Sequence, residues 1–352
     1  MGGGIIGLSL AISRRKEGLR VLIVERGEHG REASSAAAGM LVASGTELPP
    51  QLSALASESA RIYPAFVHEI EDESGEKIDL RGHGTILLMP ADFFSENAQA
   101  LPASELGKLE PNLPLPIHDR NTVGYIEERC LDPRALMDAS LKAAHHRGVD
   151  IASGSEVTRV LVEKDRVCGV ESTRTTYHST LVVNCAGAWA GCIAPQRFPV
   201  RPVKGQMLAV VGGPKLMHVI RAEKVYLVPR SDGRIVIGST LEDAGYNKQT
   251  DVNTIQYLFQ AALEILPKLS QARKHEDWAG LRPATPDNLP ILGETDTPGY
   301  FVASGHYRDG ILLAPVTARL MTNLVLNRSS SAALAPFSPA RFSETSQKST
   351  FT

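Results

Sequence analysis

Residues 2–25 read GGGIIGLSLAISRRKEGLRVLIVE, and this stretch decides the fold class. Apolar side chains recur at helical spacing over residues 5–17, and residues 20–25 form a short apolar run typical of a buried parallel strand. A glycine-rich turn, a helix and a strand therefore follow one another. This order predicts an α/β protein with a Rossmann-like dinucleotide-binding domain.

The glycines of this stretch form the pattern G-x-G-x-x-G through Gly2, Gly4 and Gly7. They allow a tight turn, close approach of the backbone to a pyrophosphate and close packing of the helix that faces it. Glu25 stands eighteen residues after Gly7, where its carboxylate can accept hydrogen bonds from ribose hydroxyls and disfavours a 2′-phosphate. We predict a dinucleotide site; the alternative is a glycine-rich turn followed by an acidic residue by chance.

The strand that should precede the glycine turn is absent, because Met1 stands directly before Gly2. In a doubly wound sheet this strand is central, so its loss would leave neighbouring strands without ladder partners. We expect that the start codon has been assigned too late and that the natural chain begins several residues earlier. The alternative is a truncated gene whose product retains its cofactor poorly.

Periodicity along the rest of the chain predicts a second domain interleaved with the first. Helices are expected at residues 52–73, 133–147, 251–266 and 310–326. Strands are expected at residues 84–89, in three runs between 156 and 183 that suggest a meander, and at 200–211, 224–229, 234–240 and 299–304. The strands after residue 200 indicate an α+β substrate domain built on an antiparallel sheet.

The resulting domain division is discontinuous. The predicted cofactor domain comprises residues 1–80, 134–199 and 282–327, and the predicted substrate domain comprises residues 81–133 and 200–281. Residues 328–352 are rich in serine and lack periodicity, which predicts a disordered tail.

Composition excludes several classes of protein. A net charge of −2 with 22% charged residues gives no basic bias toward nucleic acid. No apolar run approaches the roughly 18 residues of a membrane span. The four cysteines show no C-x-x-C pair, which is typical of reduced thiols in a cytoplasmic protein, and the ten histidines form no metal-binding pattern.

Four further segments resemble the D-amino-acid oxidase family of FAD-dependent flavoproteins, in particular its glycine oxidases. They are ASSAAAGM (33–40), VVNCAGAWA (182–190), WAGLRPATPDNLPILG (278–293) and GHYRDGILLAP (305–315). In that family the first segment runs past the pyrophosphate and along the flavin ring, and the second closes over the ribityl chain. Related sarcosine oxidases attach their flavin through a cysteine within the segment matching 278–286. This chain has none there, so the resemblance implies non-covalent FAD.

The resemblance, together with the glycine motif, also implies which residues contact FAD. Val157 is placed against the adenine through its backbone, and the helix that starts near Gly310 directs its N-terminal dipole toward the flavin. The full set is Gly2, Gly4, Ile5, Ile6, Gly7, Glu25, Arg26, Ala33, Ser34, Ala38, Gly39, Met40, Val157, Ala186, Gly187, His306, Tyr307, Arg308, Asp309, Gly310, Ile311 and Leu312. For single residues such as Ala38 or Ile6, a packing role is the alternative.

Three residues are implied in the chemistry. Arg282 corresponds to the family arginine that holds the substrate carboxylate as a bidentate fork, with a structural ion pair to Asp287 or another carboxylate as the alternative. Tyr226 corresponds to a tyrosine of the substrate pocket, although a tyrosine on a strand can equally be plain core. Arg308 matches an arginine near the flavin and the substrate entrance.

The implied reaction is oxidation of glycine, with sarcosine and small D-amino acids as secondary substrates, to the imine or 2-oxo acid, ammonia and hydrogen peroxide, with oxygen as acceptor. In bacteria such an enzyme supplies the imine for the thiazole of thiamine. Leu241 and Lys224 depart from the family pattern, where methionine and histidine are expected. The alternatives are a D-amino-acid or sarcosine dehydrogenase with another acceptor, and a flavin-poor paralogue. Relatives suggest a homo-oligomer, in particular a tetramer.

Overall fold

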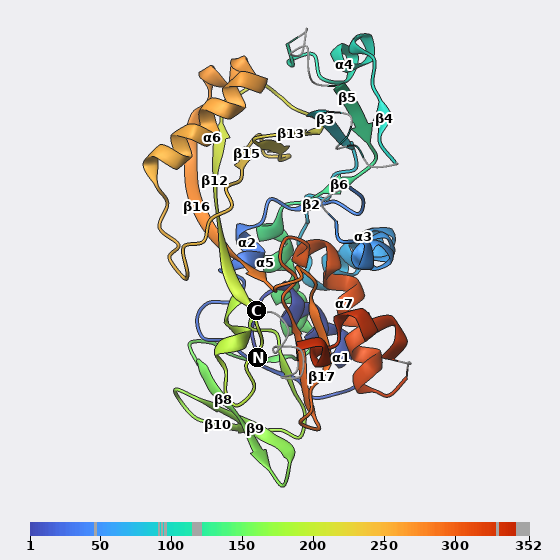
Figure 1. Ribbon diagram of the computed structural model, residues 1–352, viewed down its shortest axis with the longest axis vertical. Coiled ribbons are helices and arrows are strands. Elements are labelled where there is room, and N and C mark those ends of the chain that lie inside the picture. The colour runs from blue at the N-terminus through green and yellow to red at the C-terminus, as the bar shows by residue number, and fades with distance from the viewer. Residues whose placement is uncertain are drawn as a thin grey trace, which may run out of the picture.

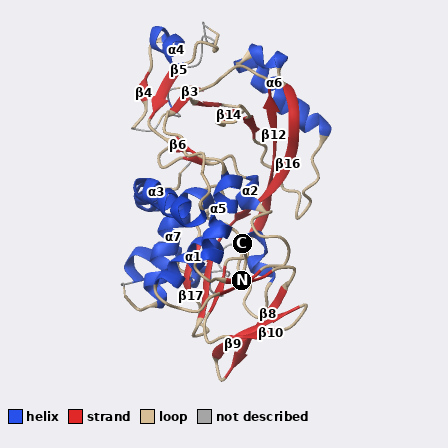
Figure 2. Ribbon diagram, turned by 180° about the vertical axis from the view of Figure 1, so that it is seen from behind, coloured by secondary structure: helices blue, strands red, loops and turns tan. Residues whose placement is uncertain are grey.

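The computed structural model describes residues 1–45, 48–90, 92, 94, 97–114, 122–328 and 331–342. It has two parts, a helix-rich lower part and an upper part built on a large sheet (Figures 1 and 2). The helices are α1 (Ile5–Lys16), α2 (Ala33–Ala36), α3 (Ser53–Ser74), α4 (Ala103–Leu109), α5 (Pro133–His146), α6 (Val252–Ile265) and α7 (Gly310–Val325). Short 3-10 turns are η1 (Pro50–Leu52), η3 (Gly187–Cys192), η4 (Pro267–Gln271), η5 (Ser331–Phe337) and η6 (Pro339–Phe342).

The upper part is an eight-stranded sheet of order β16-β12-β15-β14-β13-β3-β5-β4. Its strands are β3 (Thr85–Met89), β4 (Gln99–Ala100), β5 (Thr122–Ile126), β12 (Arg201–Val211), β13 (Val219–Ala222), β14 (Tyr226–Pro229), β15 (Ile235–Gly238) and β16 (Arg273–Ala284). Side chains alternate between the faces of a strand, so each strand contributes one row to the face under α6 and another to the face toward the lower part. The rows on the face under α6 form an apolar cluster with that helix, which includes Ile86, Leu208, Ile220, Leu227, Ile237 and Leu258.

The lower part contains smaller sheets wrapped by helices. Its strands are β1 (Leu22–Val24), β2 (Met40–Leu41), β6 (Arg129–Cys130), β7 (Asp150–Ala152), β8 (Val157–Glu163), β9 (Arg166–Ser172), β10 (Thr176–His178), β11 (Val182–Asn184), β17 (Ile291–Glu294) and β18 (Tyr300–Ser304). β1 pairs with β7 in parallel, and β8, β9 and β10 form an antiparallel meander as predicted. The third predicted run divides, because β11 leaves the meander and pairs with β18 in parallel.

Helices from opposite ends of the sequence pack together in the lower part. Ser59 and Tyr63 of α3 donate hydrogen bonds to the carbonyls of Leu312 (2.5 Å) and Ile311 (3.1 Å) in α7. α7 lies against α1 as well, where Thr322 bonds to Ser13 at 3.0 Å. The first and last helices of this part therefore share one core.

Met1 and Gly2 bridge two of the small sheets. The terminal amine of Met1 donates to the Val183 carbonyl at 2.9 Å, and the Gly2 amide donates to the Val24 carbonyl at 2.9 Å. Within the described residues, β1 pairs only with β7, and β11 pairs only with β18. The expected first strand would lie between β1 and β11, and these two residues make the backbone contacts there. Burial lowers the pKa of the Met1 amine.

The predicted helices and strands are confirmed within a few residues of each end, but the short helices α2 and α4 and the strands β2, β4, β5, β6, β7, β13, β16 and β17 were missed, and the tail was misjudged. Among the missed strands, β13 and β16 contribute to the large sheet next to the cavity described below. The disordered tail predicted for residues 328–352 is wrong for residues 331–342, which form η5 and η6, because Leu334 and Phe337 are buried against α7 and β17. Residues 329–330 and 343–352 lie outside the described residues. The division into two domains stays a prediction.

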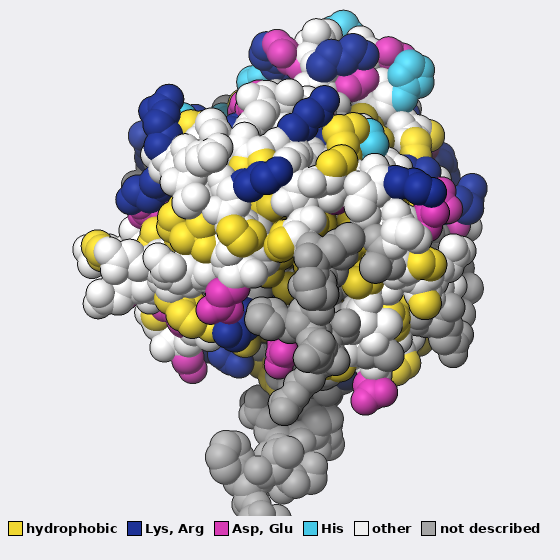
Figure 3. All heavy atoms as spheres, turned by 90° about the horizontal axis from the view of Figure 1, so that it is seen from above, with side chains coloured by type: hydrophobic (Ala, Val, Ile, Leu, Met, Phe, Trp, Pro, Cys, Tyr) yellow, Lys and Arg dark blue, Asp and Glu magenta, His cyan; other side chains and the backbone are white. Residues whose placement is uncertain are grey.

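Seen from above, the surface mixes basic, acidic and apolar side chains (Figure 3). This mixture agrees with the small net charge. In the described part of the chain, no helix combines the length and apolar character needed to cross a bilayer.

Candidate active site

A cavity of about 1010 Å³ lies between the upper sheet and the lower helices. Its walls come from the glycine-rich turn, the end of β1, the segment around α2, the start of β8, the turn before η3, the face of the upper sheet toward the lower part and the start of α7. Pockets that enclose small molecules and cofactors typically reach this size. The cavity therefore joins every segment that the sequence predicted to bind FAD.

At one end of the cavity, the glycine-rich turn packs so closely that Gly2 and Gly7 have no room for a side chain. A Cβ atom on Gly2 would lie 2.4 Å from the Cys185 carbonyl oxygen, and one on Gly7 would lie 2.0 Å from the Gly2 carbonyl oxygen. Gly4 caps α1 without any side-chain hydrogen bond, and Gly4, Ile5 and Ile6 line the cavity. An uncapped helix N-terminus that faces a cavity suits a pyrophosphate, because its amides and dipole favour negative charge.

Glu25 extends from the end of β1 into the same region. One carboxylate oxygen accepts the Gly3 amide at 2.7 Å, and the other accepts the Gly27 amide at 3.0 Å. These two bonds fix the carboxylate at the cavity wall, with lone pairs left for ribose hydroxyls. The residues present thus fit the adenosine diphosphate half of FAD.

An aromatic stack borders this end. The Arg26 guanidinium lies 3.5 Å from the ring centroid of Trp189, and Trp189 stacks on Tyr246 with centroids 5.2 Å apart. Tyr246 also donates to the Ala188 carbonyl at 3.0 Å. Trp189 was not predicted as a site residue, although it belongs to the quoted VVNCAGAWA segment.

At the opposite end, the start of α7 faces the cavity. His306, Tyr307, Arg308, Asp309, Gly310 and Ile311 all line it. Asp309 precedes the helix without a side-chain cap bond of its own. Burial lowers the pKa of His306 to about 3, so the imidazole is neutral and bonds to Thr317 at 3.2 Å. The positive field that this segment directs toward a ring bound there therefore comes from the N-terminal dipole of α7 and from Arg308, not from His306.

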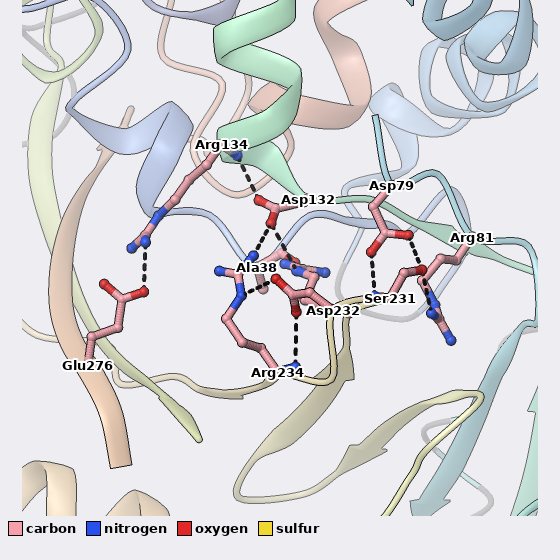
Figure 4. Close-up of polar contacts among 10 residues, drawn as sticks. Ala38, Asp79, Arg81, Asp132, Arg134, Ser231, Asp232, Arg234 and Glu276 are labelled. Atoms are coloured by element: carbon pink, nitrogen blue, oxygen red, sulfur yellow. Dashed lines mark hydrogen bonds and ion pairs between the residues drawn. The ribbon is translucent and has the colours of Figure 1, made fainter. Parts of the chain in front are cut away.

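The segment from Ala33 to Met40 is held from the upper sheet. Arg230, in the turn after β14, donates to the Ala38 carbonyl at 2.6 Å, and Trp278 of β16 donates to the Ala36 carbonyl at 3.1 Å. Figure 4 shows the surrounding polar network, in which Arg234 reaches Asp132 at 2.6 Å. This network joins the turn of the upper sheet to the start of α5, next to the segment predicted to lie along the flavin.

The upper sheet contributes one continuous row to the cavity. The strand register places Leu87 of β3, Arg221 of β13, Tyr226 of β14, Gly238 of β15 and Met207 of β12 side by side. All five line the cavity. The Tyr226 hydroxyl donates to the Met207 sulfur at 3.2 Å. Burial raises the pKa of Tyr226 although nearby arginines oppose the shift, so the phenol stays neutral and available as a donor.

Arg282 reaches the same surface from β16. Its guanidinium donates to the Ser239 hydroxyl at 2.7 Å and to the Thr240 carbonyl at 3.2 Å. The ion pair with Asp287 that we considered is not formed, because Asp287 pairs with Arg341 at 2.8 Å. Within the described residues Arg282 has no carboxylate partner, and it lines the cavity as a cation.

Three other residues singled out from the sequence also line the cavity. Lys224 is paired with Glu264 of α6 at 3.2 Å, and the Leu241 side chain is largely exposed at the edge. The Arg308 guanidinium lies 5.2 Å from the ring centroid of Tyr307.

The cavity brings together every predicted catalytic and cofactor residue except Gly7 and Leu312, which do not line it. Gly7 instead packs against the turn, and Leu312 is buried in the helical core. The contacts of the set with FAD stay predictions. Among the described residues, no cluster of metal-ligating side chains occurs.

Comparisons with known proteins place these features in a family. The family model described as FAD dependent oxidoreductase (DAO) matches residues 1–324. The glycine oxidase of Pseudomonas aeruginosa is 32% identical over 357 residues, with 97% of each chain covered. The bifunctional protein ThiO/ThiG of Trichormus variabilis is 34% identical; the match covers 97% of this chain, which spans only 54% of that relative's length. The crystal structure of glycine oxidase from Geobacillus kaustophilus superposes with a TM-score of 0.90 at 32% identity, covering 97% of both chains.

Proposed function

The chain belongs to the DAO family of FAD-dependent oxidoreductases and is an FAD-dependent amino-acid oxidase, and from this premise we propose that its principal substrate is glycine. Sarcosine and small D-amino acids are proposed as secondary substrates. The products are the imine or its hydrolysis product, the 2-oxo acid, with ammonia and hydrogen peroxide.

The balance of the reaction is simple. The amine loses two electrons and two protons overall as its C–N single bond becomes C=N, water then hydrolyses the imine to glyoxylate and ammonia, and oxygen takes the two electrons and two protons to become hydrogen peroxide. Bound FAD supplies the two-electron oxidation. The residues of the chain have to bind the substrate and orient it.

The observation that carries the proposal is Arg282, a cation in the cavity without a carboxylate partner among the described residues. A guanidinium offers a planar pair of donors that matches a carboxylate. Its bonds to Ser239 and Thr240 hold the side chain in place and leave further N–H donors for the substrate. Arg282 is therefore assigned to the substrate carboxylate.

Other residues complete the orientation. The neutral Tyr226 hydroxyl stands beside Arg282 and can turn from Met207 to the same carboxylate. Arg308, from the opposite wall, is assigned to the entrance side of the substrate. With the carboxylate fixed, the α-carbon hydrogen can be aimed at the ring, and such positioning is the main catalytic contribution of the protein.

We further propose that the oxidase serves thiamine biosynthesis, by supplying the imine of glycine for the thiazole ring. The similarity to the ThiO/ThiG protein of Trichormus variabilis supports this role, because the match covers 97% of this chain.

Glycine-dependent anaerobic reduction of the flavin, followed by admission of oxygen, tests the proposal. The expected result is bleaching of the flavin absorbance by glycine, then one hydrogen peroxide and one glyoxylate per ammonia after oxygen is admitted. Reduction by glycine with dye turnover but no peroxide would indicate a dehydrogenase instead. No reduction by glycine would refute the proposed substrate.

A further inference from the structure

The cavity-facing row of the upper sheet contains an arginine that the proposed reaction does not use. Arg221 of β13 is the register partner of Tyr226 on β14 and of Leu87 on β3. Directly opposed residues on neighbouring antiparallel strands project from the same face with Cβ atoms roughly 5 Å apart. Arg221 therefore stands beside Tyr226, at the part of the cavity assigned to the substrate.

The charge partner of Arg221 is Glu128, and it accepts no hydrogen bond from the Arg221 guanidinium. Glu128 has an oxygen 3.8 Å from the Arg221 guanidinium, which is too long for a hydrogen bond. The Glu128 side chain is only 4% exposed, and neither of its carboxylate oxygens makes a hydrogen bond within the described part of the chain. The Arg221 side chain is 20% exposed. Within the described residues, the Arg221 guanidinium makes no hydrogen bond, and Arg221 lines the cavity.

Glu128 neutralises Arg221 incompletely. Burial raises the pKa of Glu128 to about 7, against the opposing effects of Arg221 and Thr85. A substantial fraction of this carboxyl is then protonated at neutral pH, and Arg221 keeps a net positive field at the wall. Lys224 differs, because its ammonium is engaged by Glu264 at 3.2 Å on the α6 side.

The separation of the two arginines fits a small diacid. The Arg282 guanidinium is anchored at Ser239 and Thr240, immediately after β15. β14 lies between β15 and β13, so the backbone of Arg221 is two strand spacings, about 10 Å, from the backbone that anchors Arg282. Each guanidinium needs about 3 Å to reach a carboxylate oxygen. A molecule whose two carboxyl carbons are separated by two or three bonds spans the distance that is left between the two carboxylates.

We propose that Arg221 is a second anion-binding group of the substrate cavity, and that small D-amino acids with a side-chain carboxylate are accepted in preference to their neutral isosteres. Arg282 holds the α-carboxylate and Arg221 holds the side-chain carboxylate. This inference rests on the proposed amino-acid oxidase function and specifies its secondary substrates.

D-aspartate and D-asparagine provide a matched test, because they differ in charge but hardly in shape. For the wild-type holoenzyme we expect tighter binding of D-aspartate, measured in stopped flow as the perturbation of the oxidised flavin absorbance that precedes anaerobic reduction, and a higher kcat/KM for it. Arg221→Met should lower both for D-aspartate by about 10- to 150-fold, the range of a lost charged hydrogen bond. D-asparagine and glycine should change by less than about threefold, within the range of a weak surface interaction.

A control variant and an opposite variant sharpen the test. Arg201→Met removes an arginine of the same sheet that also has a carboxylate, Asp243, at 3.8 Å but does not line the cavity, so it should leave the selectivity unchanged. Glu128→Gln removes the competing carboxylate and should raise the preference for D-aspartate by about two- to fivefold. Opposite shifts in Arg221→Met and Glu128→Gln are the signature of the proposal.

The outcomes separate this inference from the function on which it rests. Equal binding of D-aspartate and D-asparagine by the wild type, or equal losses for both in Arg221→Met, overturns the role of Arg221 while glycine oxidation stands. Failure of glycine to reduce the wild-type flavin refutes the proposed function, and the binding measurement still decides whether Arg221 recognises a second carboxylate.

Discussion

Removing the guanidinium of Arg282 is the perturbation that tests the substrate site most directly. In Arg282→Leu the cavity keeps an apolar side chain, while the Ser239 hydroxyl and the Thr240 carbonyl each lose one donor. Two such bonds contribute roughly 1 to 3 kcal/mol together, so the variant should still fold and bind FAD. The substrate carboxylate loses its charged partner, which costs about 2 to 5 kcal/mol. At about 1.4 kcal/mol per tenfold, kcat/KM for glycine should fall by roughly 30- to 5000-fold.

The assay is anaerobic flavin reduction by glycine in stopped flow, with an amine that lacks a carboxylate as internal control. Oxidation of that amine should hardly respond to the substitution. Arg282→Lys should recover only part of the loss, because an ammonium cannot form the bidentate fork. If glycine reduces the flavin of Arg282→Leu as readily as that of the wild type at equal concentration, Arg282 is structural and the placement of the substrate is wrong.

Three further predictions concern the walls of the cavity. Glu25→Ala should weaken FAD binding by about 10- to 150-fold, measured by fluorescence titration of the apoprotein, while turnover of the loaded fraction hardly changes; unaltered affinity would place the ribose contact elsewhere. Gly205→Ala should raise KM for glycine and leave FAD bound, because its Cβ would lie 2.2 Å from the Arg282 guanidinium and displace it; an unchanged KM would contradict this. Adding about 5 to 6 apolar residues ahead of Met1 should raise the melting temperature and flavin occupancy, since a strand between β1 and β11 would gain two ladders and take the terminal charge out of the core; equal values in both chains would defeat it.

Local signals in the sequence predicted most elements and the cofactor end of the cavity. The glycines and Glu25 belong to one short turn-helix-strand unit, whose spacing alone fixes their geometry. β16 escaped prediction because its first half, RKHEDW, is charged and half exposed, so no apolar alternation marks it. The segment 331–342 escaped because two buried side chains, Leu334 and Phe337, hold short turns that have no period.

The substrate end depended on tertiary register, which the sequence does not display. Arg282 meets Ser239 across 43 residues, and Arg221 meets Tyr226 only through the pairing of β13 with β14. β13 is four residues long and was not predicted as a strand, so its arginine carried no signal. The predicted roles of Arg282 and Tyr226 came from family resemblance, and their shared wall became visible only in the structure.

The packing of α7 against α1 and α3 has a consequence for biosynthesis. A ribosome adds about 5 to 20 residues per second, so α7 emerges roughly 15 to 60 seconds after α1 has been made. Until then, the apolar faces of α1 and α3 that α7 covers are without their native partner. The α7 carbonyls that accept hydrogen bonds from Ser59 and Tyr63 have not yet been synthesised. During this interval the nascent chain exposes apolar surface that is prone to aggregation. Cofactor capture must follow release of the C-terminal helix, because α7 provides one wall of the cavity.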